Sequence, residues 1–406
     1  MWLLSFGSPS RPTASRGAKA FGTSPRSPWT ARRSTPVSCW ASSSPQDEPT
    51  EPTEPTETAL PSSSFSSSFK IIENVSEYCG VKPPQNYRSI PLVQRFARWT
   101  WRRRVSVLHV LHWKDPLTPV DSCINVECLW WKVLSTTDRF SPCWEPQNYT
   151  YDMLPRGSRR LVILFRRFHP RWIHALLEVR AAYLTRAIQS EREATNRKDP
   201  KKPSHATRLI SLGAGYDVRS VRLLQEAKEQ NEGEGIDATM KFYEIDLPST
   251  IESKQRVFQQ RFLKRQTTRR NNMGDTTGLS LPTMIGLDLN DIDTLEHELA
   301  QIFQDDKDNS NASWHTIFVV EGVLMYLTEG KAAAVLQACA TTARVGDKNS
   351  IRASLCFADR LFDRLDCDPA PIQQQLAQTG WELSEWAPSP NANAKHMGIA
   401  RLKLDA

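Results

Sequence analysis

The sequence predicts an α/β fold in which helices cover both faces of a doubly wound, mostly parallel sheet. Short apolar runs alternate with amphipathic segments along the second half of the chain, which is the pattern of repeated strand–helix units. Several of the apolar runs end in glycine or in an acidic residue. Because the carboxyl ends of parallel strands meet at one edge, we expect the chemistry of the protein to lie there.

The individual elements are predicted in order along the chain. Apolar residues recur at three- and four-residue spacing from Trp172 to Ala187, which predicts an amphipathic helix. Helices are also predicted after Asp217, Pro248, Asp293, Glu329 and Pro371. Five strands are predicted at RLISLG (208–213), KFYEID (241–246), TMIGLD (283–288), HTIFVVE (315–321) and SIRASLCF (350–357). The long polar stretch at 266–281 predicts a surface insertion.

Composition divides the 406 residues into three segments. Residues 1–69 are rich in Ser, Thr and Pro and contain PTEPTEPTE, so we predict a disordered leader. Residues 70–168 carry repeated tryptophans between proline breaks, which indicates a mostly helical cap. Residues 169–406 hold the alternating strands and helices and form the predicted α/β domain.

The protein has a net charge of +7, and residues 1–46 account for most of this excess because they contain Arg and Lys but no Asp or Glu. This composition is typical of an organellar transit segment, so we expect a plastid or a mitochondrion, with the cytoplasm as the alternative. No stretch approaches the roughly twenty apolar residues of a membrane span. We therefore expect no membrane span. The eight cysteines are scattered without zinc-site spacing, so no metal site is expected either.

The stretch RLISLGAGYDVRSVRLL (208–224) predicts a ligand-binding turn between a strand and a helix. Gly213 and Gly215 would let the backbone approach a ligand closely. A dinucleotide-binding turn would have a third glycine, but position 218 is Val, and Asp217 places a negative charge where a pyrophosphate would lie. The turn therefore favours a small ligand that is not polyanionic, such as S-adenosylmethionine with its sulfonium and ammonium charges.

Acidic residues at the following strand ends supply matching contacts. Glu244 and Asp246 could accept hydrogen bonds from two ribose hydroxyls. Asp288 could accept one from an adenine amino group while Leu289 packs on the ring, and Glu321 could face the ammonium group. The alternative for each acid is a helix N-cap or a first-turn charge.

Five stretches in this order resemble the leucine carboxyl methyltransferase family of class I S-adenosylmethionine-dependent methyltransferases: EVRAAYLTRAI, LGAGYDVRSVRL, FYEIDLPSTIESKQ, DLND and VVEGVLMYL. The resemblance runs from about His169 to the C-terminus and implies a seven-stranded class I methyltransferase sheet. It also implies that Arg180 holds the cofactor carboxylate. Alternatively, Arg180 is a solvated charge, and Arg186 turns toward the site. The cofactor contacts implied by the family are Gly213, Asp246, Asp288, Leu289 and Glu321, with Gly215 and Asp217 in the same turn.

The resemblance implies O-methyl transfer, with a carboxylate of a peptide or small metabolite as the expected acceptor. A carboxylate is ionised at neutral pH and needs no general base, whereas a hydroxyl acceptor would need one. His169 and His174 are candidate bases, with surface or packing roles as the alternative. Tyr326 follows Glu321 by one helical turn and is predicted to border the acceptor pocket.

Three other functions share some of these features. An NAD(P)-dependent oxidoreductase would use the same sheet and first turn. A non-catalytic nucleic-acid-binding protein could use RFARWTWRRR (95–104), where arginines alternate with tryptophans, although a nucleic-acid partner is not our expectation. A methyltransferase fold without activity could serve as an interaction module, but the acids expected around the cofactor are all present.

Overall fold

The structure, a computed structural model, describes residues 69–81, 123–154, 159–160, 162, 171–196, 206–230, 240–263, 281–309, 313–346, 352–364, 367–389 and 396–403. These residues belong to one unit, Phe65–Ala406. The predicted leader up to Ser68, the stretch 95–104, His169 and residues 264–280 of the predicted insertion lie outside the described residues.

The described chain forms an eight-stranded sheet with the order β1-β7-β8-β6-β5-β2-β3-β4. Strand β8 runs antiparallel to both of its neighbours, and all other neighbouring strands are parallel. The strands are β1 (Lys70–Ile71), β2 (Ala206–Leu212), β3 (Met240–Asp246), β4 (Thr283–Gly286), β5 (Trp314–Glu321), β6 (Arg352–Asp359), β7 (Trp381–Pro388) and β8 (His396–Leu402). This mostly parallel sheet confirms the predicted class I methyltransferase fold. The eighth strand is the two-residue β1, which pairs with β7 at the edge.

Helices connect the parallel strands as the sequence predicts. Helix α6 (Arg171–Asn196) precedes the first long strand, and a π-helical turn, η1 (Phe258–Leu263), extends α8. The five helices predicted after Asp217, Pro248, Asp293, Glu329 and Pro371 are all present. They are α7 (Arg219–Gln230), α8 (Pro248–Val257), α10 (Ile292–Asn309), α11 (Lys331–Gly346) and α12 (Pro369–Gln378). Helix α8 begins with proline at its first position, where the missing N–H costs no hydrogen bond.

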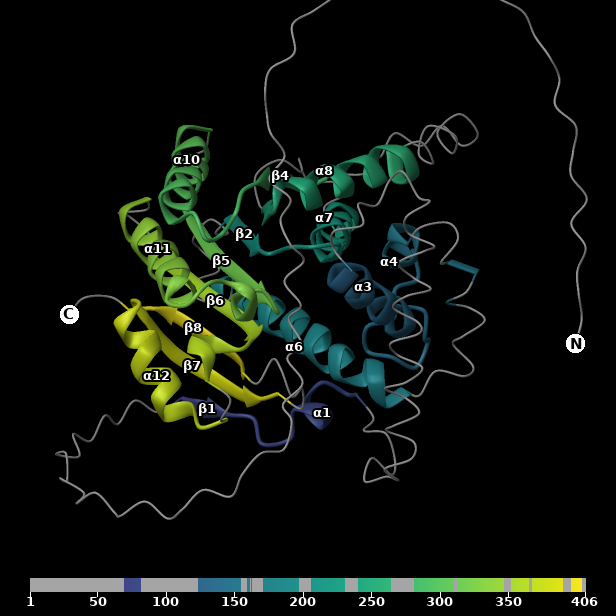
Figure 1. Cartoon of the computed structure of the whole chain (residues 1–406), viewed down its shortest axis with the longest axis horizontal. Helices are drawn as coiled ribbons and strands as arrows, with labels where there is room; N and C mark the ends of the chain where they lie inside the picture. The colour runs from purple at the N-terminus through teal and green to yellow at the C-terminus, as the bar shows by residue number, and fades with distance from the viewer. Residues whose placement is uncertain are drawn as a thin grey trace, which may run out of the picture. The chain divides into compact units, whose positions relative to one another are not determined.

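Each face of the sheet has its own hydrophobic core. Neighbouring residues such as Leu209 and Ile210 belong to different clusters because side chains alternate along a strand. One cluster joins the sheet to α10, α11 and α12, and the other joins it to α6 and to the short helix α1 (Val75–Tyr78). Helices α10 and α11 pack side by side (Figure 1). The sheet is therefore covered on both faces, as a parallel sheet requires.

The described part of the predicted cap packs on the α/β domain. Helices α3 (Cys123–Thr136) and α4 (Tyr149–Met153) lie in a third cluster with residues of α7, α8 and η1. Trp130 and Val133 of α3 belong to this cluster, as do Val218 and Val221 at the start of α7. Because Val218 directly follows Asp217, this packing brings the cap beside the glycine turn.

Strand β2 marks the point where the direction of sheet growth reverses. It pairs with β3 on one side and with β5 on the other, and all three run parallel. In open α/β sheets the connections on either side of such a strand leave in opposite directions, and ligands bind outside its carboxyl end. The Gly213–Gly215 turn follows β2 at this end.

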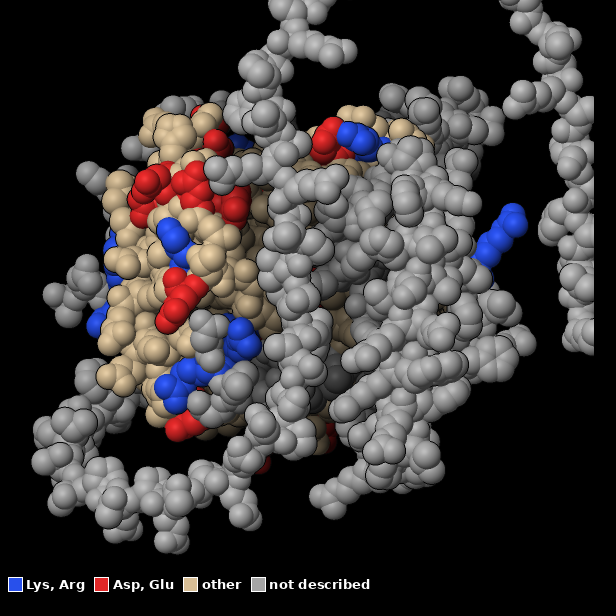
Figure 2. All heavy atoms as spheres, in the orientation of Figure 1, with Lys and Arg blue, Asp and Glu red and all other residues tan. Residues whose placement is uncertain are grey.

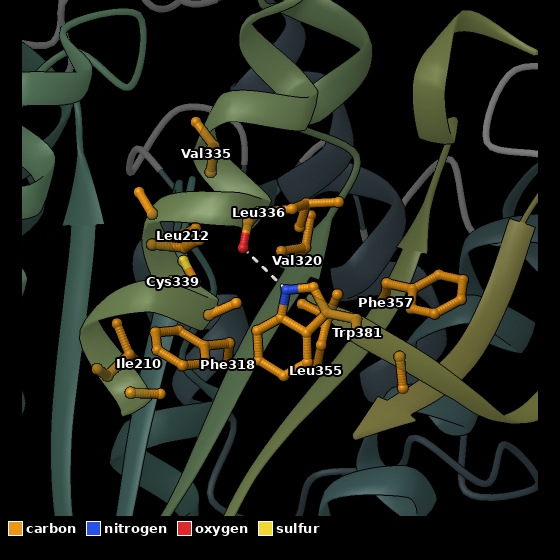
Figure 3. Packing of buried hydrophobic residues seen from close by; sticks show 14 of the residues in the cluster. Ile210, Leu212, Phe318, Val320, Val335, Leu336, Cys339, Leu355, Phe357 and Trp381 are labelled. Atoms are coloured by element: carbon orange, nitrogen blue, oxygen red, sulfur yellow. Dashed lines mark hydrogen bonds between the residues drawn. The ribbon is translucent and has the colours of Figure 1, made fainter. Parts of the chain in front are cut away.

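Trp381 at the start of β7 fills the larger core. Its side chain is fully buried, and its Nε1 donates a hydrogen bond to the Leu336 carbonyl in α11 at 2.8 Å (Figure 3). Its ring meets Phe318 edge-to-face, with 5.9 Å between centroids. This residue therefore fixes α11 against the sheet by both packing and a hydrogen bond.

We expect Trp381→Phe to destabilise the fold by roughly 1–3 kcal/mol, because the Leu336 carbonyl loses its indole donor and the smaller ring leaves part of the core unfilled. Urea unfolding followed by circular dichroism would measure the change. Trp144→Phe is the matched control, since Trp144 is 46% exposed. Equal unfolding midpoints for the two variants would contradict this account of the core.

Candidate functional site

The turn after β2 has a backbone conformation that requires glycine. Gly213 has φ +65° and Gly215 has φ +47°, in the left-handed region that side chains disfavour. A Cβ at Gly213 would also lie 2.3 Å from Cγ2 of Val323, a residue of the turn after β5. The two turns are therefore in direct contact, and only glycine allows this approach.

Asp246 at the end of β3 binds the glycine turn. Its Oδ2 accepts a hydrogen bond from the Gly215 N–H at 2.6 Å, and its Oδ1 accepts one from the Leu247 N–H at 2.7 Å. The residue is 8% exposed. Each carboxylate oxygen can accept a further hydrogen bond. Asp246 is thus positioned beside the turn with capacity for ligand hydroxyls.

Glu244 lies two residues earlier on β3 and makes different contacts. It forms an ion pair with Lys254 of α8 at 2.7 Å and accepts a hydrogen bond from the Ser220 hydroxyl. Both members of the ion pair are buried. Burial raises the pKa of Glu244, although Lys254 and Ser220 act to lower it. Since these partners belong to the protein, the placement favours a structural role for Glu244, and the predicted ribose contact is left to Asp246.

A cluster of partly buried charges lies at the ends of β2 and β5. Glu321 Oε2 is 3.2 Å from Lys132 Nζ and 3.0 Å from Arg219 Nη2. Asp217 Oδ2 is 2.9 Å from the same lysine and 3.4 Å from the same arginine. Asp217 also accepts a hydrogen bond from the Arg219 N–H at the start of α7. Asp217 therefore both binds the start of α7 and belongs to the charge cluster.

Arg180 joins this charge cluster from α6. Its Nη2 is 3.5 Å from Glu321 Oε1, and the residue is 7% exposed. Its Nε is buried without a hydrogen-bond partner in the described part of the chain. Arg186 instead lies over the Tyr78 ring, 5.4 Å from its centroid. The prediction that Arg180 faces the site is therefore favoured over the solvated alternative.

The cluster perturbs the acidity of its members. Burial alone would raise the pKa of Asp217, but Arg219 and Lys132 outweigh it and hold that pKa well below its usual value. Burial would also raise the pKa of Glu321, but the neighbouring Lys132, Arg219 and Arg180 outweigh it and lower that pKa. Burial would lower the pKa of Lys132, but the two carboxylates raise it. All of these side chains are therefore charged at neutral pH.

The remaining predicted residues lie nearby with different exposures. Asp288 is exposed and accepts hydrogen bonds from the N–H and the side-chain amide of Asn290, both at 2.9 Å. Leu289 is buried in the larger core. Tyr326, in the short 3₁₀ turn Leu324–Tyr326, is 58% exposed. Asn290 Oδ1 accepts from the Thr328 N–H at 3.0 Å, so the turns after β4 and β5 are hydrogen-bonded to each other.

Sequence reasoning missed three residues that the structure places at or beside the site. Arg219 lies two residues after Asp217, and this spacing at a helix start could have indicated an internal ion pair. Lys132 is the single cation of the largely apolar helix CINVECLWWKVLST, which could have indicated a buried partner. Asp359 ends β6, and its carboxylate accepts hydrogen bonds from backbone N–H groups of the turn after β5. It continues the pattern of acids at strand ends.

Comparison with known families identifies the central part of the chain. Residues 168–340 match the family model of leucine carboxyl methyltransferase. This segment, which is less than half of the chain, is similar to the methyltransferases of that family. The resemblance predicted from the sequence is confirmed over these residues, which include α6, the glycine turn and the charge cluster apart from Lys132. The methyltransferase domain is thus of the class that depends on S-adenosylmethionine.

Solved structures with related folds have low sequence identity to the chain. Magnesium protoporphyrin IX methyltransferase from Synechocystis PCC 6803 is 15% identical, with 61% of this chain and 92% of that chain covered and a TM-score of 0.32. Human N-acetylserotonin methyltransferase is 12% identical, with 68% and 70% covered and a TM-score of 0.29. No curated protein sequence matches the chain.

The described residues contain neither a metal-binding group of side chains nor a membrane-spanning helix. Among them, no three His, Cys, Asp or Glu side chains are grouped so that they could hold a metal ion. None of the described helices has both the length and the apolar character needed to cross a bilayer.

Gly213→Ala should disrupt the methyltransferase domain at its first turn. The new Cβ meets both an unfavourable φ and Val323, so we expect a loss of roughly 1–2 kcal/mol from strain and about 1–3 kcal/mol more from overpacking. Gly330→Ala is the control, because Gly330 has φ +76° but no atom within 4 Å of the added Cβ. Thermal unfolding would compare them, and equal losses would show that the contact with Val323 is unimportant.

The charge cluster should make stability depend on pH in acid. A carboxylate whose pKa is lowered by folding stabilises the protein above its unfolded pKa, about 4, and this contribution is lost as the pH falls through the folded pKa. We expect Glu321→Gln to cost roughly 3 kcal/mol at neutral pH, because Arg180 loses its carboxylate partner and Lys132 and Arg219 keep only Asp217, and to cost less in acid. Urea unfolding from pH 7 to pH 3 would test this. The exposed Glu329→Gln is the control, and parallel curves for Glu321→Gln and wild type would contradict the prediction.

Proposed function

We propose that the protein transfers a methyl group from S-adenosylmethionine to an oxygen acceptor, and that this acceptor is a carboxylate of a peptide or small metabolite. The observation that carries the proposal is the partly buried charge cluster beside the Gly213–Gly215 turn. Its described members are three cations and two carboxylates, which leaves an excess of one positive charge. An excess of charge in a site shielded from water is unfavourable unless it is paired.

The cluster suits the amino-acid end of the cofactor. The carboxylate of S-adenosylmethionine would compensate the excess positive charge, and the buried, unpartnered Nε of Arg180 is available to donate to it. Glu321 would accept hydrogen bonds from the ammonium group. Lys132 lies close enough to Glu321 to provide a second cation for the carboxylate. This assignment would supply a basic contact from the cap, in addition to Arg180.

The rest of the cofactor would lie along the carboxyl ends of β2, β3 and β4. Asp246 would accept hydrogen bonds from the ribose hydroxyls, since both of its oxygens retain acceptor capacity. The glycine turn would lie against the nucleoside. Asp288 is exposed and could accept from the adenine amino group, with Leu289 beneath the ring.

Bound S-adenosylmethionine would supply a methyl group already activated by the sulfonium. The residues of this chain would then act by orienting the donor and the acceptor and by excluding water. A carboxylate acceptor is itself ionised and requires no proton transfer. The exposed Tyr326 lies in the turn after Glu321 and would border the acceptor. The family match, whose description names a carboxyl group, supports the carboxylate acceptor.

The alternative functions have less support. For an NAD(P)-dependent oxidoreductase, Asp217 would place a negative charge at the start of α7, where a pyrophosphate needs N–H donors. The Arg/Trp-rich stretch that suggested nucleic-acid binding lies outside the described residues. Acidic side chains gather where Figure 1 places α10 and α11 (Figure 2), which disfavours a polyanion on that face.

Asp246→Ala should abolish binding of S-adenosylhomocysteine, the stable product form of the cofactor. The variant removes the acceptors for two ribose hydroxyls and the anchor of Gly215. Isothermal titration calorimetry would measure the affinity, with Asp293→Ala, at an exposed acid in the first turn of α10, for comparison. Unchanged affinity in Asp246→Ala would contradict the assigned cofactor site.

The acceptor can be identified by transfer of a labelled methyl group. Wild type and Asp246→Ala would be incubated with radiolabelled S-adenosylmethionine and a cell extract. A carboxylate acceptor predicts label that is released by mild base as methanol, and only with the wild type. Label that resists base would contradict the carboxylate assignment while leaving methyl transfer in place.

A further inference from the structure

The turn after β5 lies against the glycine turn and continues to Tyr326. The side chain of Val323 occupies the space beside Gly213, as the 2.3 Å approach of a hypothetical Cβ shows. Gly322 has φ +62°, and a Cβ there would lie 2.7 Å from Arg180 Nη2. The position of this turn therefore determines the surroundings of two predicted cofactor contacts.

Asp359 at the end of β6 holds this turn by its backbone. Its carboxylate accepts hydrogen bonds from the N–H groups of Val323 at 2.6 Å, Leu324 at 2.8 Å and Met325 at 3.3 Å, and from that of Arg360 at 2.7 Å. The residue is fully buried. Four donors to one carboxylate satisfy its acceptor sites and fix the three consecutive turn residues as one rigid unit.

The neighbouring contacts reinforce this arrangement. The Gly322 N–H donates to the Ala358 carbonyl at 3.1 Å, and Arg360 Nη2 donates to the Met325 carbonyl at 3.4 Å. The end of β6 thus binds the turn through three successive residues, 358–360. The family match ends at residue 340, so the residue that fixes the turn lies beyond the matched segment.

We propose that Asp359 is a positioning residue for the methyltransferase site, which acts through the Gly322–Tyr326 turn on Gly213 and on Tyr326. This inference rests on the proposed function, because the affected groups are the proposed cofactor and acceptor contacts. Asp359 does not itself contact either substrate. It sets the distance between the turns after β2 and β5, and so the space that the cofactor enters.

Asp359→Asn tests the inference with little change of shape. The amide nitrogen cannot accept a hydrogen bond, so at least one turn N–H loses its acceptor. We expect affinity for S-adenosylhomocysteine, measured by calorimetry well below the unfolding temperature, to fall about tenfold or more. Glu191→Gln is the matched control. Glu191 is a buried acid of α6 that binds Ser354 and Arg401 at the other end of the sheet.

A second variant tests the route of the effect. Val323→Ala removes the side chain that meets Gly213 and leaves the buried carboxylate in place, so it is informative even if Asp359→Asn does not fold. If Asp359 acts through Val323, the variant with both substitutions should bind S-adenosylhomocysteine as tightly as whichever single variant binds it less tightly. Affinity losses that multiply would overturn this route.

Hydrogen exchange of the peptide that contains residues 322–326 gives a readout without any ligand. Faster exchange there in Asp359→Asn, but not in Glu191→Gln, is the expected result. If wild type binds S-adenosylhomocysteine and Asp359→Asn binds equally well with unchanged exchange, the inference is overturned and the proposed function stands. If wild type does not bind, the proposed function fails, and the exchange data still show whether Asp359 orders the turn.

Discussion

The arrangement of the site depends on one shared carboxylate, that of Glu321. Three cations from different helices approach it: Lys132 from α3, Arg180 from α6 and Arg219 from α7. Because Glu321 ends the strand next to β2, its position is fixed by the sheet, and the cations align their helices to it. Without this carboxylate the three cations would have only Asp217 near them, and Arg180 would lose its ion pair. The cap, the first helix and the glycine turn are therefore joined by electrostatics as well as by packing.

Local patterns were sufficient to predict the parallel half of the sheet. The five predicted strands correspond to β2 through β6, because each is an apolar run bounded by turn residues and followed by a helix. Strands β7 and β8 were not predicted individually. The alternation in β7 is interrupted by a bulge between Leu383 and Glu385. Gly398 lies inside β8, where a Cβ would come within 2.5 Å of the Glu385 carbonyl and the Phe357 ring. A required glycine and a bulge both weaken the strand pattern.

The site was predictable where it follows strand ends and unpredictable where it depends on long-range contacts. The structure places Asp246, Asp217 and Glu321 beside the glycine turn, as expected for acids at the carboxyl edge. Glu244 has the same chemistry two residues earlier, but its position faces Lys254 inside the protein, and only the packing of α8 reveals this. Lys132 lies far from its partners in sequence, so no local pattern could have assigned it to the site.

The edge of the sheet formed by β7 also has a structural consequence. A strand edge with free N–H and C=O groups can pair with another chain and start aggregation. Strand β1 covers part of this edge, and Ile72 extends the pairing through a hydrogen bond to the Trp386 carbonyl. Lys70 secures it by an ion pair of 2.8 Å with Glu385, which also accepts from the Tyr183 hydroxyl. Residues 70–72 thus prevent part of β7 from pairing with a strand of another molecule. A protein shortened beyond Ile72 would expose this edge and be less soluble.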